Sequence, residues 1–264
     1  MVSATNRREE IVRLATTTGL ATVDELSARF SVTASTIRRD LALLHDKGRL
    51  ARTFGGAIGL ATHPEASLRQ RIGEAYLPKR GIGRWVAGLV RPGESLLLDA
   101  GSTVGAAAHE LRSIRNLRVA TIGLSILDEL ADADGVQVDC LGGRLRHLSQ
   151  SFLGPLTEAA LERMTFDRLF LGTDGVTADS GICEADLEQT RLKELMARRA
   201  DRVYVLAHGA KLGARPFHAW AVLDLPWTLV TDSSASAAQI APFLALGITV
   251  VVVDENGVEI PTGG

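Results

Sequence analysis

The chain has little of what marks secreted, metal-binding or membrane-spanning proteins. Its 264 residues include two cysteines, Cys140 and Cys183, which lie far apart and match no metal-ligand spacing. No apolar run reaches the roughly 18 residues that a membrane span needs, and the start MVSATNRREEI turns polar where a signal peptide turns apolar. We therefore expect a cytoplasmic protein with two buried thiols of no assigned role, no metal, no cofactor and no membrane partner.

The sequence also lacks low-complexity tracts and blocks of like charge. Apolar residues make up 46% and charged residues 23%, which is typical of a folded globular chain. At about 150 residues per domain, the length favours two unequal domains. Residues 1–60 hold nine Lys/Arg and six Asp/Glu, a net charge of +3, whereas residues 61–264 hold twenty and twenty-five, a net charge of −5. A positive N-terminal part has the sign that a DNA-binding domain needs.

The first sixty residues contain three helix-sized patterns. Apolar spacing predicts helices from Arg7 to Thr18, from Thr22 to Phe30 and from Ala34 to Asp46. The tight connection at residues 31–33 is typical of a helix-turn-helix, and Thr33 can cap the third helix. The predicted inner face of that helix consists of Ile37, Leu41 and Leu44.

With that face turned inward, polar side chains near the start of the third helix are left exposed. Hydroxyls can contact base edges, and guanidinium groups can contact guanine or phosphate. Two strand-like runs around Gly55-Gly56 predict a hairpin, or wing, beside this helix. The predicted DNA contacts are Thr33, Ser35, Thr36, Arg38, Arg39, Arg49 and Arg52. From spacing and charge alone, a small helical domain with a solvated basic face is the alternative.

Residues 22–57, TVDELSARFSVTASTIRRDLALLHDKGRLARTFGGA, resemble the helix-turn-helix and wing of the DeoR family almost residue for residue. The features that carry the resemblance are Ser31-Val32-Thr33, the block Thr36-Ile37-Arg38-Arg39-Asp40-Leu41, and Gly55-Gly56-Ala57. This likeness implies a transcription regulator whose partner is double-stranded operator DNA.

Beyond residue 60 the pattern changes to alternating strands and helices. His63-Pro64 interrupts the apolar pattern, so we predict a DNA-binding domain over 1–60, a linker over 61–75 and a second domain over 76–264. Short apolar runs separated by helix-sized patterns predict an α/β domain with a mainly parallel sheet. The predicted strands are Ser95–Asp99, Leu117–Ile122, Val136–Leu141, Arg168–Leu171, Arg202–Leu206, Thr228–Thr231 and Ile248–Val253.

Three loops follow predicted strands, at the edge of such a sheet where ligands bind. Residues 99–103 offer hydroxyls and a helix N-terminus that suit a phosphate, although the hydroxyls could simply cap the helix. Gly142-Gly143 would let the backbone approach a ligand and Arg144 could neutralise an anion, but a plain turn fits equally well. Lys211 could reach a phosphate or carboxylate, although a loop lysine is usually solvated.

Together with the N-terminal domain, these loops resemble the sensor domain of the DeoR family, a sugar-phosphate effector domain similar in fold to ribose-5-phosphate isomerase. The likeness spans nearly the whole chain, and it implies a phosphorylated sugar as effector and a homo-oligomer. The residues that it places on the effector loops are Asp99, Gly101, Ser102, Thr103, Thr121, Gly142, Gly143 and Lys211. Arg144 completes the predicted effector site.

The chain departs from the family pattern at several of these positions. An asparagine commonly follows the threonine that we place at Thr121, but here Ile122-Gly123 follows. The late loop usually has aspartate and serine before its lysine, whereas this chain has His208 and Ala210 at those positions. At another position where the family often has a glutamate, this chain has Gln189. We therefore expect either an atypical effector or an impaired site.

The leading hypothesis is a repressor of a carbohydrate-metabolism operon, in which a phosphorylated sugar changes the geometry of an oligomer and hence its operator binding. An isomerase-like enzyme is one alternative, because Asp99, Glu184, His208 and Lys211 are titratable groups near the predicted loops. They form no evident acid and base pair, and similarity of fold does not carry activity. The other alternative is a constitutive DNA-binding regulator whose sensor is degenerate.

Overall fold

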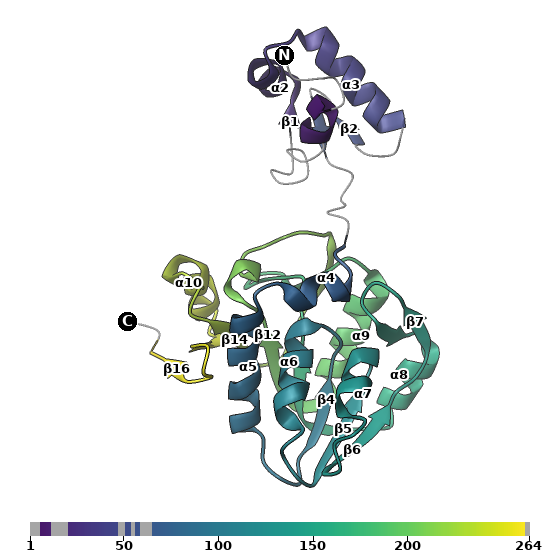
Figure 1. The fold of residues 1–264 in the computed structure, drawn as a ribbon, viewed down its shortest axis with the longest axis vertical. Coiled ribbons are helices and arrows are strands. Elements are labelled where there is room, and N and C mark those ends of the chain that lie inside the picture. Colours follow the sequence, from purple (N-terminus) through teal and green to yellow (C-terminus); the bar gives the residue numbers. More distant parts are fainter. Residues whose placement is uncertain (1–5, 12–20, 47–50, 54–55, 59–64, 262–264) are drawn as a thin grey trace. The chain divides into compact units, whose positions relative to one another are not determined.

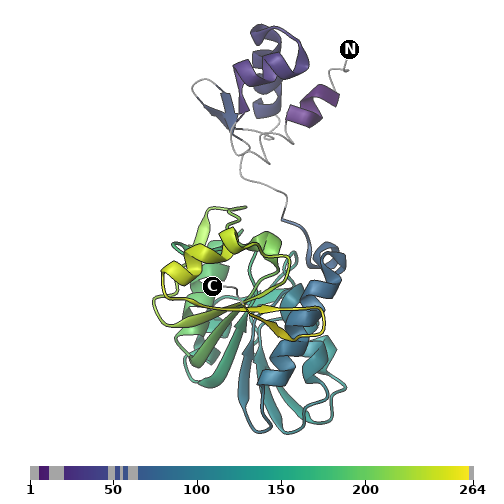
Figure 2. The same cartoon turned by 90° about the vertical axis from the view of Figure 1, so that its left-hand side faces the viewer.

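The computed structural model describes residues 6–11, 21–46, 51–53, 56–58 and 65–261. The chain divides into two compact units, Met1–Pro64 and Glu65–Gly264, which Figures 1 and 2 show in two views. Each unit has its own apolar core, so each is described separately.

In the first unit, helices enclose a small core. Residues 6–11 are helical, α2 spans Val23–Phe30 and α3 spans Ala34–Asp46, as the spacing predicts. The buried apolar side chains are Ile11, Val23, Leu26, Ile37, Leu41 and Leu44. The inner face predicted for the third helix is therefore confirmed, while the end of the predicted first helix, residues 12–18, lies outside the described residues.

A small antiparallel sheet completes the first unit. Its order is β1 (Ala21–Thr22), β3 (Gly56–Ile58) and β2 (Ala51–Thr53). Strands β2 and β3 form the predicted wing. Strand β1, which the sequence did not predict, pairs with β3, and Gly55 lies outside the described residues.

The second unit is built around an eight-stranded sheet of order β16-β15-β14-β12-β9-β4-β5-β6. All neighbours are parallel except β15 and β16. The strands are β4 (Ser95–Leu98), β5 (Leu117–Thr121), β6 (Val136–Cys140), β9 (Phe166–Leu171), β12 (Ala200–Leu206), β14 (Trp227–Asp232), β15 (Thr249–Val253) and β16 (Glu259–Ile260). The seven predicted strands are confirmed to within two residues at each end, and β16 is additional. Of the two cysteines expected to be buried, Cys183 is buried, whereas Cys140 at the end of β6 is exposed.

Helices cover both faces of this sheet (Figure 1). Side chains alternate between the faces along each strand, so Leu96 and Leu98 of β4 lie in one apolar core and Leu97 lies in the other. The helices packed in the first core are α5 (Tyr76–Leu89), α6 (Ser102–Leu111) and α7 (Leu124–Leu130). Those in the second are α8 (Pro155–Leu161), α9 (Leu187–Ala197) and α10 (Ala237–Ala245).

Shorter elements complete the second unit. They are the hairpin β7 (Arg144–Arg146) and β8 (Ser151–Leu153), the sheet of β10 (Gly175–Thr177), β11 (Gly181–Glu184) and β13 (Ala219–Ala221), and the turn η1 (Gly209–Lys211). Helix α4 (Leu68–Gly73) falls within the segment predicted as a linker. Its first backbone N–H, at Leu68, donates to the carbonyl of Leu148 at 2.9 Å. No helix in the described part of the chain is long and apolar enough to cross a membrane.

Candidate functional site

The N-terminal end of α3 carries a group of hydroxyls. Thr33 Oγ1 accepts a hydrogen bond from the Thr36 N–H at 3.3 Å, as expected of a cap. The same oxygen lies 2.9 Å from Ser35 Oγ and 3.0 Å from Thr36 Oγ1. Ser35, Arg38 and Arg39 are exposed. This face can therefore reach base edges and phosphates, as the recognition helix of a helix-turn-helix does.

Asp40, the next residue of α3, is buried. Its carboxylate accepts hydrogen bonds from Arg7 Nε and Arg8 Nε, both at 2.7 Å. Although burial opposes ionisation, these two guanidinium groups hold the pKa of Asp40 below its usual value. The ion pairs fix the first helix against α3 and leave the exposed arginines of α3 to other partners. The remaining predicted DNA contacts are Arg52, within β2, and Arg49, outside the described residues.

The second candidate site lies where the order of the parallel strands reverses. From β4 the sheet continues through β5 and β6 on one side and through β9 on the other, and a crevice forms beyond the carboxyl ends of strands at such a point. The loop after β4 and the loop after β9 meet there, because the Gly172 N–H donates to Asp99 Oδ2 at 2.9 Å. The cavity is lined by Arg71, Asp99, Ala100, Gly101, Ser102, Thr103, Ser149, Gly172, Thr173, Glu184, Gln189, Lys193 and Lys211.

The loop after β4 presents the start of α6 to this cavity. Gly101 is the N-cap, with a φ of 120°, and no side chain makes a capping hydrogen bond there. Capping therefore does not account for Ser102 and Thr103, both of which line the cavity. A helix N-terminus with adjacent hydroxyls suits an anion.

Lys193 of α9 forms ion pairs with two carboxylates that line the cavity. Its Nζ lies 2.9 Å from Asp99 Oδ2, also pairs with Glu184, and donates to the Gly172 carbonyl at 2.8 Å. Burial raises the pKa of Glu184 to about 7, although the ammonium favours its charged form. Burial opposes the charge of Lys193, but the two carboxylates raise its pKa above the usual value. Glu184 is therefore a buried acid whose pKa lies near neutral pH.

Lys211 approaches the cavity from the turn after β12. Its Nζ donates to the Thr173 carbonyl, and burial lowers the pKa of Lys211 to about 8. Burial, together with the charge of Lys211, lowers the pKa of His208 to about 4, so this imidazole is neutral at pH 7. Lys211 is thus a cation that no carboxylate neutralises by direct contact among the described residues.

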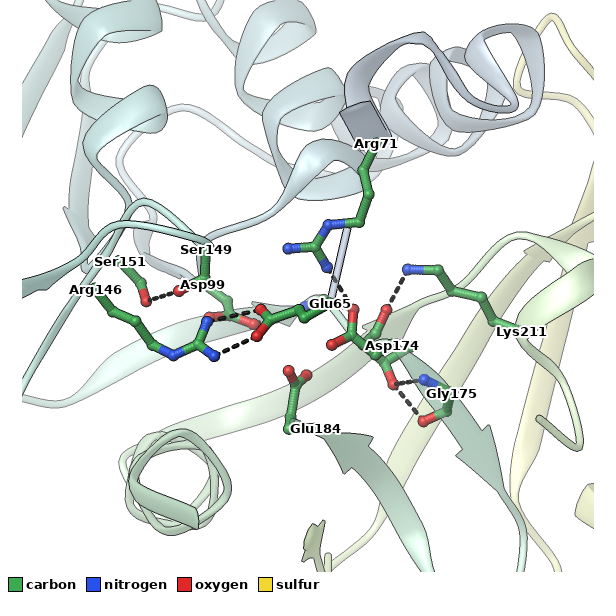
Figure 3. Close-up of polar contacts among 12 residues, drawn as sticks. Glu65, Arg71, Asp99, Arg146, Ser149, Ser151, Asp174, Gly175, Glu184 and Lys211 are labelled. Atoms are coloured by element: carbon green, nitrogen blue, oxygen red, sulfur yellow. Dashed lines mark hydrogen bonds and ion pairs between the residues drawn. The ribbon is translucent and has the colours of Figure 1, made fainter. Parts of the chain in front are cut away.

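Helix α4 adds a cation that the sequence did not predict. Arg71 points from α4 into the cavity and pairs with Asp174, as Figure 3 shows. The side chains of this pair are 14% and 9% exposed. Just before α4, Glu65 forms two hydrogen bonds with Arg146 of β7. The segment that follows the first unit is therefore part of the wall of this site.

Several predicted effector residues lie outside the lining of the cavity. Thr121 is buried, and its Oγ1 donates to the Leu98 carbonyl and accepts from the Gly123 N–H. Gly143 packs so tightly that an added Cβ would lie 2.3 Å from Thr157 Oγ1. The others are Gly142, whose carbonyl accepts from Thr157, and Arg144, which pairs with exposed Glu188. The structure gives these four residues structural contacts, whereas Asp99, Gly101, Ser102, Thr103 and Lys211 come together at the cavity.

The lining residues that the sequence analysis missed belong to two groups. Gly172, Thr173 and neighbouring Asp174 follow a correctly predicted strand, so the rule that ligands bind beyond strand ends could have found them. Arg71, Ser149 and Lys193 carry no such signal, because their place depends on how α4, the β7–β8 hairpin and α9 pack.

Comparisons with known proteins identify both domains. Residues 7–62 match the model of the DeoR-like helix-turn-helix domain, and residues 74–233 match that of the DeoR C-terminal sensor domain. The chain belongs to the DeoR family. It is therefore a DNA-binding transcriptional regulator and not an enzyme.

Curated relatives of this DeoR-family chain match it over most of their length. It is 30% identical to a putative aga operon transcriptional repressor of Escherichia coli O157:H7, over 97% of this chain and 96% of that protein. It is 31% identical to the regulator GlpR of Haloferax volcanii, over 93% and 96%, and 31% identical to the repressor GlcR of Bacillus subtilis, over 90% and 88%.

Solved structures match the regulator more weakly. Ribose 5-phosphate isomerase A from Neisseria gonorrhoeae aligns with a TM-score of 0.38 and 15% identity, over 50% of this chain and 52% of that chain. The eIF-2B translation initiation factor from Pyrococcus horikoshii aligns with a TM-score of 0.40 and 16% identity, over 82% and 68%. No functional argument rests on likenesses of this size.

Proposed function

We propose that this DeoR-family regulator represses a sugar-metabolism operon and that a phosphorylated sugar binds in the cavity between α4, α6 and the β9–β10 loop. The observation that carries the proposal is the state of Arg71, which lines this cavity and whose Nε is buried without a hydrogen-bond partner among the described residues. A buried guanidinium N–H without an acceptor is costly, and a phosphate oxygen would supply the acceptor. Lys211 and the N-terminus of α6 face the same space and suit the same anion.

The other end of the ligand would meet hydrogen-bond acceptors. Gln189 is 7% exposed and lines the cavity, and its Oε1 is buried with no hydrogen-bond partner in the described ranges. A sugar hydroxyl is a donor of the right kind for this oxygen. The names of relatives support a sugar as ligand class, since they include a lactose phosphotransferase system repressor of Streptococcus mutans. The departure from the family at Gln189 is thus a candidate for effector specificity.

The DNA side of the proposal uses the exposed face of α3. Thr33, Ser35, Thr36, Arg38 and Arg39 would contact the operator, and Arg49 and Arg52 are the further contacts that the sequence predicts. A single small domain binds DNA weakly, and paired half-sites need paired recognition helices. We therefore infer a homo-oligomer, which acts in the cytoplasm, where operator DNA and phosphorylated sugars occur together.

A fluorescence anisotropy titration tests this function. Full-length protein is titrated with a duplex from the region upstream of its gene and with a scrambled duplex at physiological salt, and a panel of pentose and hexose phosphates is then added. The proposal predicts preference for the upstream duplex and a change in its affinity with at least one phosphate ester. Preference without any response would leave a constitutive regulator, and no preference would contradict the DNA-binding assignment.

A further inference from the structure

The ion pair between Arg71 and Asp174 is incomplete on both sides. One hydrogen bond joins Arg71 Nη1 to Asp174 Oδ1. In the part of the chain that the structure describes, Arg71 Nε and Asp174 Oδ2 are both buried without a partner. An arginine and a carboxylate usually gain most from two parallel hydrogen bonds. This pair joins α4 to the β9–β10 loop (Figure 3) with half of that capacity unused.

The other carboxylates of the site are held on a different cation. Asp99 accepts from the N–H groups of Ala100 and Gly172 and pairs with Lys193. Glu184 pairs with Lys193 as well. Lys211 donates to a backbone carbonyl. Among the described residues that line or border the cavity, Asp174 is therefore the carboxylate that pairs with the guanidinium of Arg71.

We propose that Asp174 is a specificity residue that acts as an internal competitor, whose place on Arg71 the anionic group of the effector must take. The inference rests on the proposed function of the cavity. A neutral sugar has no anionic oxygen to exchange for the carboxylate. A phosphate offers several oxygens, so it can engage both Nη1 and Nε of Arg71, which Asp174 does not. The exchange selects phosphorylated over unphosphorylated sugars.

The exchange also changes what holds α4. Lys79 of α5 donates to the carbonyls of Arg71 and Glu74, at 2.5 and 2.6 Å, and so anchors the end of α4 to α5. The side chain of Arg71 links the same helix to the β9–β10 loop through Asp174. When a phosphate takes the place of Asp174, α4 stays anchored at Lys79 but is released from that loop. Selectivity and the position of α4 thus depend on one residue.

Calorimetric titration of the full-length chain with inorganic phosphate at pH 7.5 tests the proposal. Asp174→Asn keeps the shape of the side chain and removes its charge. It is expected to bind phosphate about tenfold more tightly than the wild type, the effect of about 1.4 kcal/mol of like-charge repulsion. The control, Asp179→Asn, removes an exposed carboxylate paired with Arg215 and is expected to bind phosphate like the wild type. Unchanged, weaker or undetectable binding in Asp174→Asn would overturn the proposal.

A second neutral variant covers the case in which Asp174→Asn does not fold. Asp174→Ser removes the same charge with a smaller side chain. It is also expected to bind phosphate more tightly than the wild type, and unchanged or weaker binding would again overturn the proposal. The titration contains no DNA, so its result is separate from the proposed function. If Asp174→Asn binds phosphate more tightly but no sugar phosphate changes the operator affinity of the wild type, the sensor function would be contradicted and the competitor role of Asp174 would stand.

Discussion

At the scale of single residues, charges in both units are divided between internal pairs and exposed groups. Arg7 and Arg8 form ion pairs with buried Asp40, whereas Arg38 and Arg39 of the same unit are exposed. The sequence could predict this division, because helical spacing turns Ile37 and Leu41 inward and leaves the two arginines outside. It could not predict the partners of Asp40, since these depend on how the first helix packs on α3.

The exposed arginines of α3 give the first prediction. Arg38→Ala and Arg39→Ala are each expected to weaken operator binding by about 1 to 3 kcal/mol. A contact to guanine would also be seen as lost base preference, and a contact to phosphate as a shallower salt dependence. Anisotropy titration at several salt concentrations measures both. Arg29→Ala, at an exposed arginine of α2 paired with Glu10, is the control, and an equal loss in this variant would contradict the assignment of α3.

The titratable groups of the cavity give the second prediction. The pKa of Lys211 is lowered to about 8 and that of Glu184 is raised to about 7. As the pH rises from 6.5 to 8.5, the site therefore loses a positive charge and gains a negative one, and both changes disfavour an anion. Binding of inorganic sulfate, measured by calorimetry, is expected to weaken by about tenfold or more over this range.

The control for this pH dependence is Glu184→Gln. This variant removes the group with the pKa near 7 and is expected to flatten the part of the profile below pH 7.5, leaving the part due to Lys211. Sulfate binding that is independent of pH in the wild type would contradict the assignment of these groups to an anion site.

At the scale of elements, α4 has two faces with different surroundings. Arg71 lines the polar cavity, whereas Leu68 and Ile72 line a second, more apolar cavity bounded by α5, α6 and α7. Gly101 and Ser102 border both cavities. The short apolar strands could be predicted from pattern alone. Helix α4 could not, because a six-residue helix has too few turns to show a period and its stability comes from packing.

The loop at Gly142-Gly143 shows where a sequence signal has a structural cause. Both glycines have positive φ, 66° and 115°. An added Cβ at Gly143 would lie 2.3 Å from Thr157 Oγ1 and 2.6 Å from the Leu153 carbonyl, whereas at Gly142 it would meet nothing within 4 Å. The glycine pair therefore serves the turn between β6 and β7 and its contact with β8 and α8.

This difference gives the third prediction. Gly143→Ala is expected to lower the free energy of unfolding by about 3 kcal/mol, through strain at positive φ and a clash with backbone, and Gly142→Ala by about 1 kcal/mol, through strain alone. Urea unfolding measures both, and sulfate calorimetry on the folded proteins should show wild-type affinity. Equal losses of stability in the two variants, or weaker sulfate binding by folded Gly142→Ala, would restore the loop as a ligand site.

At the scale of the whole molecule, the segment that follows the first unit contributes to the wall of the proposed effector cavity. The first unit ends at Pro64, Glu65 pairs with Arg146, and Arg71 lies in the cavity wall. An effector can change operator binding only if it binds the two states of the protein differently. A side chain of α4 that exchanges a carboxylate for a ligand supplies such a difference at the segment that continues into the DNA-binding unit.

The most direct test is the ratio of operator dissociation constants with and without a sugar phosphate, compared between the wild type and Arg71→Gln. The sugar phosphate is the panel member with the largest effect on the wild type. We expect a ratio that differs from one by about tenfold or more in the wild type, which is about 1.4 kcal/mol of coupling, and a ratio near one in Arg71→Gln. An equally large ratio in both proteins would contradict the claim that Arg71 connects the effector site to DNA binding.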